Sequence, residues 1–333
     1  MRKNSAWKLV ITVATACVMG LSLCACGEGS SQLPDYSADK PITSPLTGMV
    51  YDDEIGGRPL IVSIDNVGEA IPQSNLSYAD MVYEFPVEGL QTRLEAVFMG
   101  DFPECFGPIR STRPYFVDLT REMKGVFLAH GWSGAARRYL QKGYVPYINA
   151  MNSELHFYRV ADKPGPHDSY IKWSTVKGKI KKEGWWKDAK KPRSFKFLHG
   201  SQKGKGAKAT KISFRYSYSN CEFTYDSATN SYKRTISGTP YIDKENGKQI
   251  AVNNVLVQRV KSRVYDHKGR LKINMTKGGK AMLFTGGKVI KGTWSRKNLN
   301  SRTIFKDKNG KEFRLTPGKT WVEVADQNCT IKY

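Results

Sequence analysis

The first 26 residues constrain this chain most, because they determine where the rest of it folds. Arg2, Lys3 and Lys8 form a positive segment, and residues 9–23 are an apolar run without charge. This run is short and ends abruptly, so it has the layout of an export signal rather than of a membrane-spanning helix. We therefore expect the mature chain to fold outside the cytoplasm.

The end of the signal resembles a bacterial lipobox. Leu23 stands three residues before Cys26, and the small residue Ala25 precedes it directly. Small residues are needed there because a signal peptidase must close on that backbone. Residues 1–25 are thus the predicted lipoprotein signal peptide, and Cys26 is the predicted lipidated residue, which would hold the chain on the outer face of the cell membrane. A plain secretory signal cleaved near Ala25 is the alternative.

Charge divides the remaining chain into two halves. Residues 27–176 hold 13 Lys and Arg against 19 Asp and Glu, whereas residues 177–333 hold 37 against 11. A half with a net charge of +26 indicates a polyanion or an anionic membrane as partner. Outside a membrane these partners are lipid headgroups and wall polymers, and the export signal argues against nucleic acid. The alternative is that the lysines, including Lys203, Lys205, Lys208 and Lys211, merely solvate a β surface.

The pattern of apolar residues changes at the same place. After a flexible Gly/Ser/Pro tether at 26–44, residues 45–176 alternate strands (59–64, 81–85, 94–98 and 126–130) with helices (115–124 and 133–142), so we expect a mixed α/β N-terminal domain. Pro114 suits a first helical turn, and Ser133 and Gly143 suit the two ends of a helix.

The basic half shows a different pattern of residues. Residues 177–191 are a basic connector, although the segment from 174 to 191 also fits a short surface helix. Beyond it, residues 192–333 are expected to form an antiparallel β-rich C-terminal domain. Its predicted strands include 213–218, 222–225, 231–236 and 255–260, and Asn309-Gly310 is a strong hairpin signal. The predicted fold class is therefore α+β.

Several strings together resemble the YerB-like lipoprotein family, which has a domain of unknown function followed by its own C-terminal domain. They are RPLIVSIDN (58–66), PQSNL (72–76), ADMVYE (79–84), VEGLQTR (87–93), GPIRSTRPY (107–115), NNV (253–255), GTW (292–294) and GKTW (318–321). Leu90 departs from the family pattern, which has a second glycine there, and Asp168 stands where an amide is expected. The resemblance implies fold and location, and it supplies no activity.

Arginines at a predicted helix entrance form the first candidate site. Arg110, Ser111 and Arg113 lie in the loop before Pro114, and Arg93 is added from the preceding strand. Forked arginine donors beside exposed backbone N–H groups suit a phosphate, sulfate or carboxylate. The alternative is that these arginines pair with Asp65, Glu84 or Glu88 and hold the domain together.

Carboxylates and histidines form a candidate acid–base set. Two carboxylates, such as Glu84 and Glu88, are what glycoside cleavage requires. His130 or His167 beside Asp65 or Asp168 is a candidate base, although a lone histidine at a strand end is usually a satisfied polar residue.

Other chemistry is not indicated by the sequence. There is no GxSxG, HExxH, P-loop or GxGxxG after a strand, so we expect no cofactor and no ATP- or NAD-dependent enzyme. There is no CxxC and no zinc-site spacing, so we expect no metal. Cys105, Cys221 and Cys329 remain after export, and a Cys221–Cys329 disulfide is left open.

Two classes of function remain. The first is a lipid-anchored extracytoplasmic envelope protein that binds or scaffolds an anionic envelope component or a partner protein. The second is an envelope hydrolase or transferase acting on a glycan or a phosphodiester.

Overall fold

The computed structural model describes residues 44–50, 57–187, 192, 194–199, 206–216 and 219–333. The predicted signal peptide, Cys26 and the tether up to residue 43 lie outside the described residues, as do Lys203 and Lys205. The structure confirms the predicted fold class, with an N-terminal mixed α/β region followed by a β-rich region with antiparallel sheets. No helix in the described part of the chain is long and apolar enough to cross a membrane.

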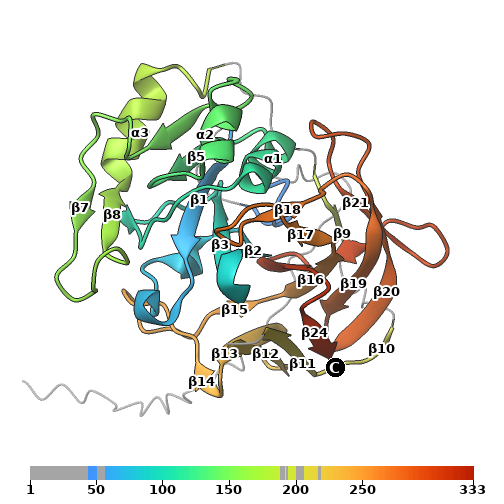
Figure 1. The fold of residues 1–333 in the computed structure, drawn as a ribbon. Helices are drawn as coiled ribbons and strands as arrows, with labels where there is room; N and C mark the ends of the chain where they lie inside the picture. Colours follow the sequence, from blue (N-terminus) through green and yellow to red (C-terminus); the bar gives the residue numbers. More distant parts are fainter. Residues whose placement is uncertain (1–43, 51–56, 188–191, 193, 200–205, 217–218) are drawn as a thin grey trace, which may run out of the picture. The chain divides into compact units, whose positions relative to one another are not determined.

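One sheet runs through both halves of the sequence (Figure 1). Its order is β10-β20-β19-β16-β23-β2-β3-β1-β5-β6, with β21 added beside β20. The strands of the first half are β1 (Leu60–Asp65), β2 (Met81–Pro86), β3 (Thr92–Phe98), β5 (Val126–Ala129) and β6 (Tyr147–Asn149). Those of the second half are β10 (Ala207–Lys208), β16 (Asn254–Arg259), β19 (Gly279–Thr285), β20 (Lys288–Ser295), β21 (Ile304–Asp307) and β23 (Thr320–Ala325).

The two halves join where β23 lies between β16 and β2. Both of these pairings are parallel, and Glu323 of β23 stands opposite Glu84 of β2. Every residue of β2 and β23 is buried. Because this joint consists of backbone hydrogen bonds within a buried sheet, the acidic and basic halves of the sequence share one framework.

The helices of the first half begin where their sequences predict, although the second of them ends at Leu140, two residues before the predicted end at residue 142. In α1 (Pro114–Met123), Pro114 occupies the first turn and Lys124 ends the helix in a left-handed conformation. In α2 (Gly134–Leu140), the Ser133 side chain accepts a hydrogen bond from the N–H of Ala136. A third helix, α3 (Trp173–Lys182), covers part of the basic segment, so the helix alternative holds there.

The remaining strands form smaller sheets. In the first half these are β4 (Cys105–Phe106), β7 (Tyr158–Arg159) and β8 (Ser169–Lys172). In the second half a six-stranded sheet contains β11 (Lys211–Tyr216), β12 (Ser219–Asp226), β13 (Ser231–Ile236), β14 (Thr239–Pro240), β15 (Ala251–Val252) and β24 (Thr330–Lys332). Two short pairs complete the fold, β17 (Ser262–Val264) with β18 (Leu271–Ile273), and β9 (Lys196–Phe197) with β22 (Arg314–Leu315).

Two hydrophobic clusters cover the two faces of the large sheet. One contains α1 residues such as Phe116, together with Phe85 and Trp294. The other contains Ile180 of α3, Phe223 of the six-stranded sheet and other buried residues. The predicted Asn309-Gly310 hairpin is present, because Phe313 donates a backbone hydrogen bond to Phe305 across it.

Candidate functional site

Parallel strands bring several candidate residues to one edge of the sheet. Strands β1, β5 and β6 run parallel, so their carboxyl ends lie together. Asp65 ends β1, His130 follows β5, and Asn149 ends β6. In α/β sheets this edge is where ligands usually bind.

Asp65 is the centre of this edge. Its side chain is fully buried, and Oδ2 lies 2.8 Å from Arg110 Nε and 2.7 Å from His167 Nδ1. The other carboxylate oxygen accepts a hydrogen bond from the N–H of Asn66. The side chains of Arg110 and His167 retain 25% and 15% of their exposure. The buried carboxylate therefore fixes the orientation of two partly exposed side chains.

His130 lies at the same edge but has a different partner. Its Nδ1 is 2.5 Å from Ser169 Oγ. Burial lowers the pKa of His130, and the nearby positive charges of Arg159 and Arg110 lower it further. Arg159 itself forms an ion pair with Asp168, the residue that stands in place of the family's amide.

The other candidate arginines are engaged inside the protein. Arg113 is buried, forms a two-pronged ion pair with Glu88 and donates to the backbone oxygen of Thr112. Arg93 is also buried and donates to the backbone oxygen of Ser111 at 2.8 Å. Burial, with Arg113 close by, lowers the pKa of Arg93 to about 10. These contacts match the architectural alternative, and anion binding by Arg93, Arg110, Ser111 and Arg113 stays a prediction.

Glu84 belongs to a buried network at the β2–β23 joint, which Asn66 links to Asp65 by donating to both carboxylates. It accepts hydrogen bonds from Thr92, Asn66 and the indole of Trp321, and it pairs with fully buried Arg234 at 3.0 Å. Glu84 and Glu88 thus contact different partners, and their use as a glycosidase pair stays a prediction.

Glu323 adds a second carboxyl group to this network. Burial and the charge of Glu84 raise its pKa well above the usual range. Tyr216 donates to one of its oxygens at 2.6 Å, and the other oxygen has no partner in the described structure. No sequence pattern indicates Arg234 or Glu323, because these partners lie 150 and 239 positions from Glu84 along the chain.

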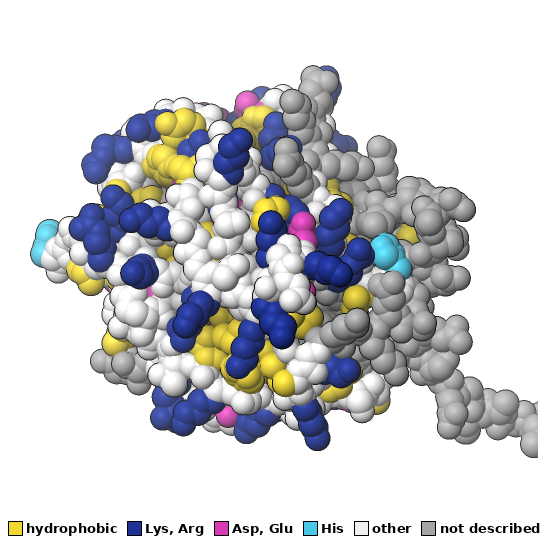
Figure 2. All heavy atoms as spheres, turned by 90° about the vertical axis from the view of Figure 1, so that its right-hand side faces the viewer, with side chains coloured by type: hydrophobic (Ala, Val, Ile, Leu, Met, Phe, Trp, Pro, Cys, Tyr) yellow, Lys and Arg dark blue, Asp and Glu magenta, His cyan; other side chains and the backbone are white. Residues whose placement is uncertain are grey.

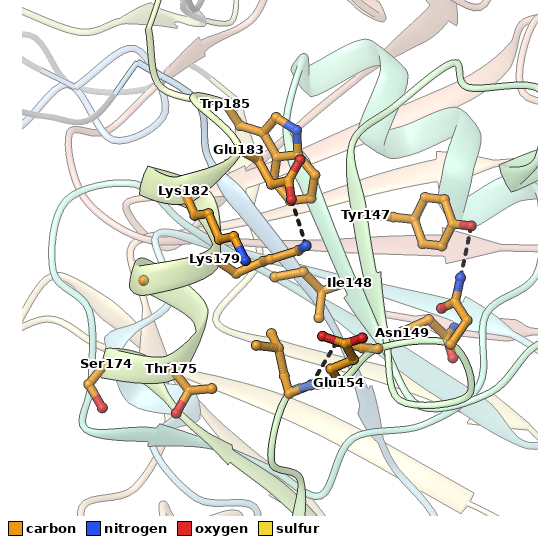
Figure 3. A pocket seen from close by; sticks show the side chains of 14 residues that line it. Tyr147, Ile148, Asn149, Glu154, Ser174, Thr175, Lys179, Lys182, Glu183 and Trp185 are labelled. Atoms are coloured by element: carbon orange, nitrogen blue, oxygen red, sulfur yellow. Dashed lines mark hydrogen bonds and ion pairs between the residues drawn. The ribbon is translucent and has the colours of Figure 1, made fainter.

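Two cavities are lined by none of the candidate acid–base or arginine residues, although Asn149 lines the first. One, of about 660 Å³, separates edge strand β6 from α3, and Figure 3 shows Tyr147 and Asn149 on one side of it and Lys179 and Glu183 on the other. Lys179 and Glu183 form an ion pair at 2.6 Å across one helical turn. The second, of about 650 Å³, is a more apolar groove between α1, α2 and the β17–β18 hairpin.

Free positive charge is concentrated on the second half of the sheet. On neighbouring strands Lys280 stands opposite Thr293, which stands opposite Lys306, so these exposed side chains form one row across β19, β20 and β21. Lys291 lies two residues before Thr293 and therefore on the same face. We call Lys280, Lys291 and Lys306 the lysine face. None of the three has an ion pair with another described residue.

Figure 2 views this side of the molecule, where Lys and Arg side chains greatly exceed Asp and Glu. The described residues contain no group of three or more His, Cys, Asp or Glu that could hold a metal ion. Cys105, Cys221 and Cys329 are free thiols, and burial raises the pKa of Cys221 well above its usual range.

Comparison with known proteins gives consistent results. Residues 46–186 match the family described as "Protein of unknown function (DUF3048) N-terminal domain", and residues 212–322 match its C-terminal domain. The chain is 33% identical over 323 residues to "Putative lipoprotein YerB" of Bacillus subtilis (strain 168), covering 95% of each chain. A crystal structure of the YerB protein from Bacillus subtilis matches with a TM-score of 0.78 and 30% identity, covering 88% of this chain and 100% of that one.

Proposed function

This chain belongs to the YerB-like DUF3048 family, and from that premise we propose that it is anchored by a lipid on Cys26 outside the cell membrane and binds an anionic envelope polymer. The relative's name supports a lipoprotein-like envelope protein. The lipobox at residues 23–26 supports Cys26 as the anchor.

The anchor is tested by metabolic labelling. Cells that express the full chain and grow with a radioactive fatty acid should yield a labelled protein. The Cys26→Ala variant should carry no label. Label that survives in Cys26→Ala, or wild-type protein without label, would show that Cys26 carries no lipid.

The single observation that carries the binding proposal is the lysine face. Adjacent strands lie about 4.8 Å apart and alternate residues about 7 Å apart, so the Cα atoms of its three lysines are spaced by roughly 8–10 Å. This spacing is close to the Debye length of about 8 Å at physiological ionic strength, so the charges act together on one partner. An extended row of this kind suits a polymer that repeats phosphate or carboxylate groups, whereas a single small ion would contact only one lysine.

The candidate arginines already have contacts inside the protein, which explains why the candidate polymer site is the lysine face. Arg113 and Arg110 already have carboxylate partners, and Arg93 is buried. An incoming anion would have to displace Glu88 or Asp65, whereas the lysines of the face have no carboxylate partner to displace, and Lys291 lies over the ring of Tyr333.

Sedimentation with purified cell-wall fragments tests the proposal. The chain from residue 26 on, with Cys26→Ser, should sediment with the fragments at low salt and be released as salt is raised. Lys280→Ser/Lys291→Ser/Lys306→Ser should weaken binding by about tenfold or more, at up to about 1 kcal/mol per contact.

The matched control removes the same charge elsewhere. Lys177, Lys181 and Lys182 are exposed on or near α3, far along the chain from the face, and their triple change to Ser should leave binding nearly unchanged. Equal losses for the two triple variants would mean that only net charge matters, and the lysine face would not be the site.

The Asp65–His167 pair favours a second candidate function, an envelope hydrolase or transferase acting on a glycan or a phosphodiester. A buried carboxylate that holds a partly exposed imidazole is the arrangement of a general base. In the same sedimentation experiment, soluble fragments released by the wild type but not by His167→Ala would support this candidate.

A further inference from the structure

The β17–β18 hairpin and its surroundings form an exposed apolar surface. Val264 and Tyr265, at the tip of the hairpin, keep 60% and 38% of their exposure. Leu90 and Tyr144 lie nearby and are 38% and 47% exposed. Leu90 and Val264 line one small cavity, while the ring of Tyr144 packs 5.4 Å from Tyr139, which lines the apolar groove. We call these four residues the hairpin surface.

A groove opens beside the hairpin surface. It holds about 650 Å³, and its walls include Tyr115 and Tyr139 from the helices and Tyr265 and Ile273 from the hairpin. Leu271 lines both this groove and the small cavity that Val264 lines, so the two cavities adjoin at the hairpin. The volume and the apolar walls are of the size and kind that accommodate a small molecule or part of a larger one.

Cations surround this apolar surface. Arg138 and Lys142 line the groove from the helix side, and Arg263 and Lys272 line it from the hairpin side. None of the four forms an ion pair with another described residue. The single carboxyl group in the lining, Asp118, accepts a hydrogen bond from Tyr139 at 2.6 Å, and burial raises its pKa. The groove therefore has positive charge without a partner.

Exposed aliphatic and aromatic side chains beside unpaired cations have the properties of a membrane interface. Apolar side chains enter the boundary between headgroups and acyl chains, tyrosine suits the headgroup level, and each nearby cation adds about 1 kcal/mol on an anionic leaflet. We propose that the hairpin surface docks on an anionic lipid membrane, with Val264 and Tyr265 in the interface and a lipid phosphate group beside the cations of the groove.

The length of the tether favours a membrane, rather than a soluble acidic peptide, as the partner of the hairpin surface. With the Cys26 anchor proposed above, residues 27–43 span at most about 60 Å, so the folded part stays close to the lipid surface. An anchor of this kind raises the effective concentration of the membrane at the surface of the protein, and a weak docking surface is then sufficient.

Vesicle sedimentation tests this proposal without the anchor. The chain from residue 26 on, with Cys26→Ser, is mixed with vesicles of phosphatidylglycerol and phosphatidylcholine in equal parts, or with phosphatidylcholine alone. Binding is expected only to the anionic vesicles. Val264→Ser/Tyr265→Ser should weaken it by about tenfold, because the apolar side chains no longer enter the interface. Arg263→Ser/Lys272→Ser should weaken it by about 25-fold, or about fivefold per cation.

The matched control is Lys177→Ser/Lys181→Ser, which removes the same charge from α3 and should bind as the wild type does. Thermal unfolding should show that all variants are folded, as expected for exposed positions. The proposal is overturned if the hairpin variants bind as the wild type does, if the control loses as much as Arg263→Ser/Lys272→Ser, or if the wild type does not bind anionic vesicles. Because this assay contains neither the lipid anchor nor wall polymer, its failure is distinguishable from failure of the proposed function.

Discussion

Glu95 shows how a single residue sets a pH dependence. It is fully buried on β3, accepts a hydrogen bond from Ser63 at 2.9 Å, and its second oxygen has no partner in the described structure. Burial raises the pKa of this carboxyl group well above its usual range. The folded protein therefore keeps a proton on Glu95 at a pH where the unfolded chain has lost it.

We predict that the free energy of unfolding falls as pH rises, because the folded state keeps this proton. The unfolded glutamate ionises near pH 4.3, so above that pH ionisation lowers the free energy of the unfolded state but not that of the folded state. The free energy of unfolding falls by up to about 1.4 kcal/mol per pH unit until the pH passes the pKa of Glu95 in the folded state. Glu95→Gln has no proton to lose, so its free energy of unfolding should rise relative to the wild type between pH 4 and pH 7. Denaturant unfolding at both pH values measures this, and a difference that does not change with pH would refute it.

Leu90 shows what a departure from a family pattern means in physical terms. The family resemblance leads us to expect a glycine here, and Leu90 adopts φ +57°, a conformation that glycine adopts freely and that costs a leucine about 1–2 kcal/mol. The sequence alone identified the position as unusual. The exposure of the side chain beside Val264, which gives it a place in the hairpin surface, required the structure.

At the scale of elements, the joint between β2 and β23 rests on a buried ion pair. The guanidinium of Arg234 lies 3.0 Å from Glu84 and packs over the rings of Tyr241 and Trp321 at 4.0 and 4.4 Å. These residues come from the two halves of the sequence, so the pair couples the stability of the halves.

A double-mutant cycle tests this coupling. Arg234→Met should lower the free energy of unfolding by about 3–5 kcal/mol, because it leaves the charge of Glu84 buried without its partner. Adding Glu84→Gln removes that charge, so the double variant should be less destabilised than the sum of the two single variants. Strictly additive losses in denaturant unfolding would mean that the two residues do not depend on each other.

Elements with local signals were predictable. Pro114 and Ser133 marked the helix starts, and the alternation at 231–236 matched β13. Strands β19 and β20 were missed, although Gly286-Gly287 between two alternating runs is a hairpin signal. The place of β23 could not be predicted, because its parallel pairing with β2 joins residues far apart in sequence, and parallel register leaves no local pattern.

The whole molecule separates its charges by role. Arg110 and Arg113 of the acidic half are held by carboxylates, and Arg93 donates to the backbone oxygen of Ser111, whereas the lysine face of the basic half is exposed and forms no ion pair with another described residue. Sequence patterns located the acid–base and arginine residues along the chain, and they indicated an anionic partner for the second half. They could not tell which cations are already paired, because pairing depends on tertiary contacts such as Arg110 with Asp65.

The central claim is that the lysine face, and not the arginine loop, binds the polyanion. The most direct measurement is a two-dimensional NMR titration of the isotope-labelled chain from residue 26 on, carrying Cys26→Ser, with inorganic polyphosphate as the probe. The account predicts salt-sensitive shifts for backbone amides around Lys280, Lys291 and Lys306, with little change at residues 110–113. Shifts centred on Arg110 and Arg113, or no localised shifts, would contradict it.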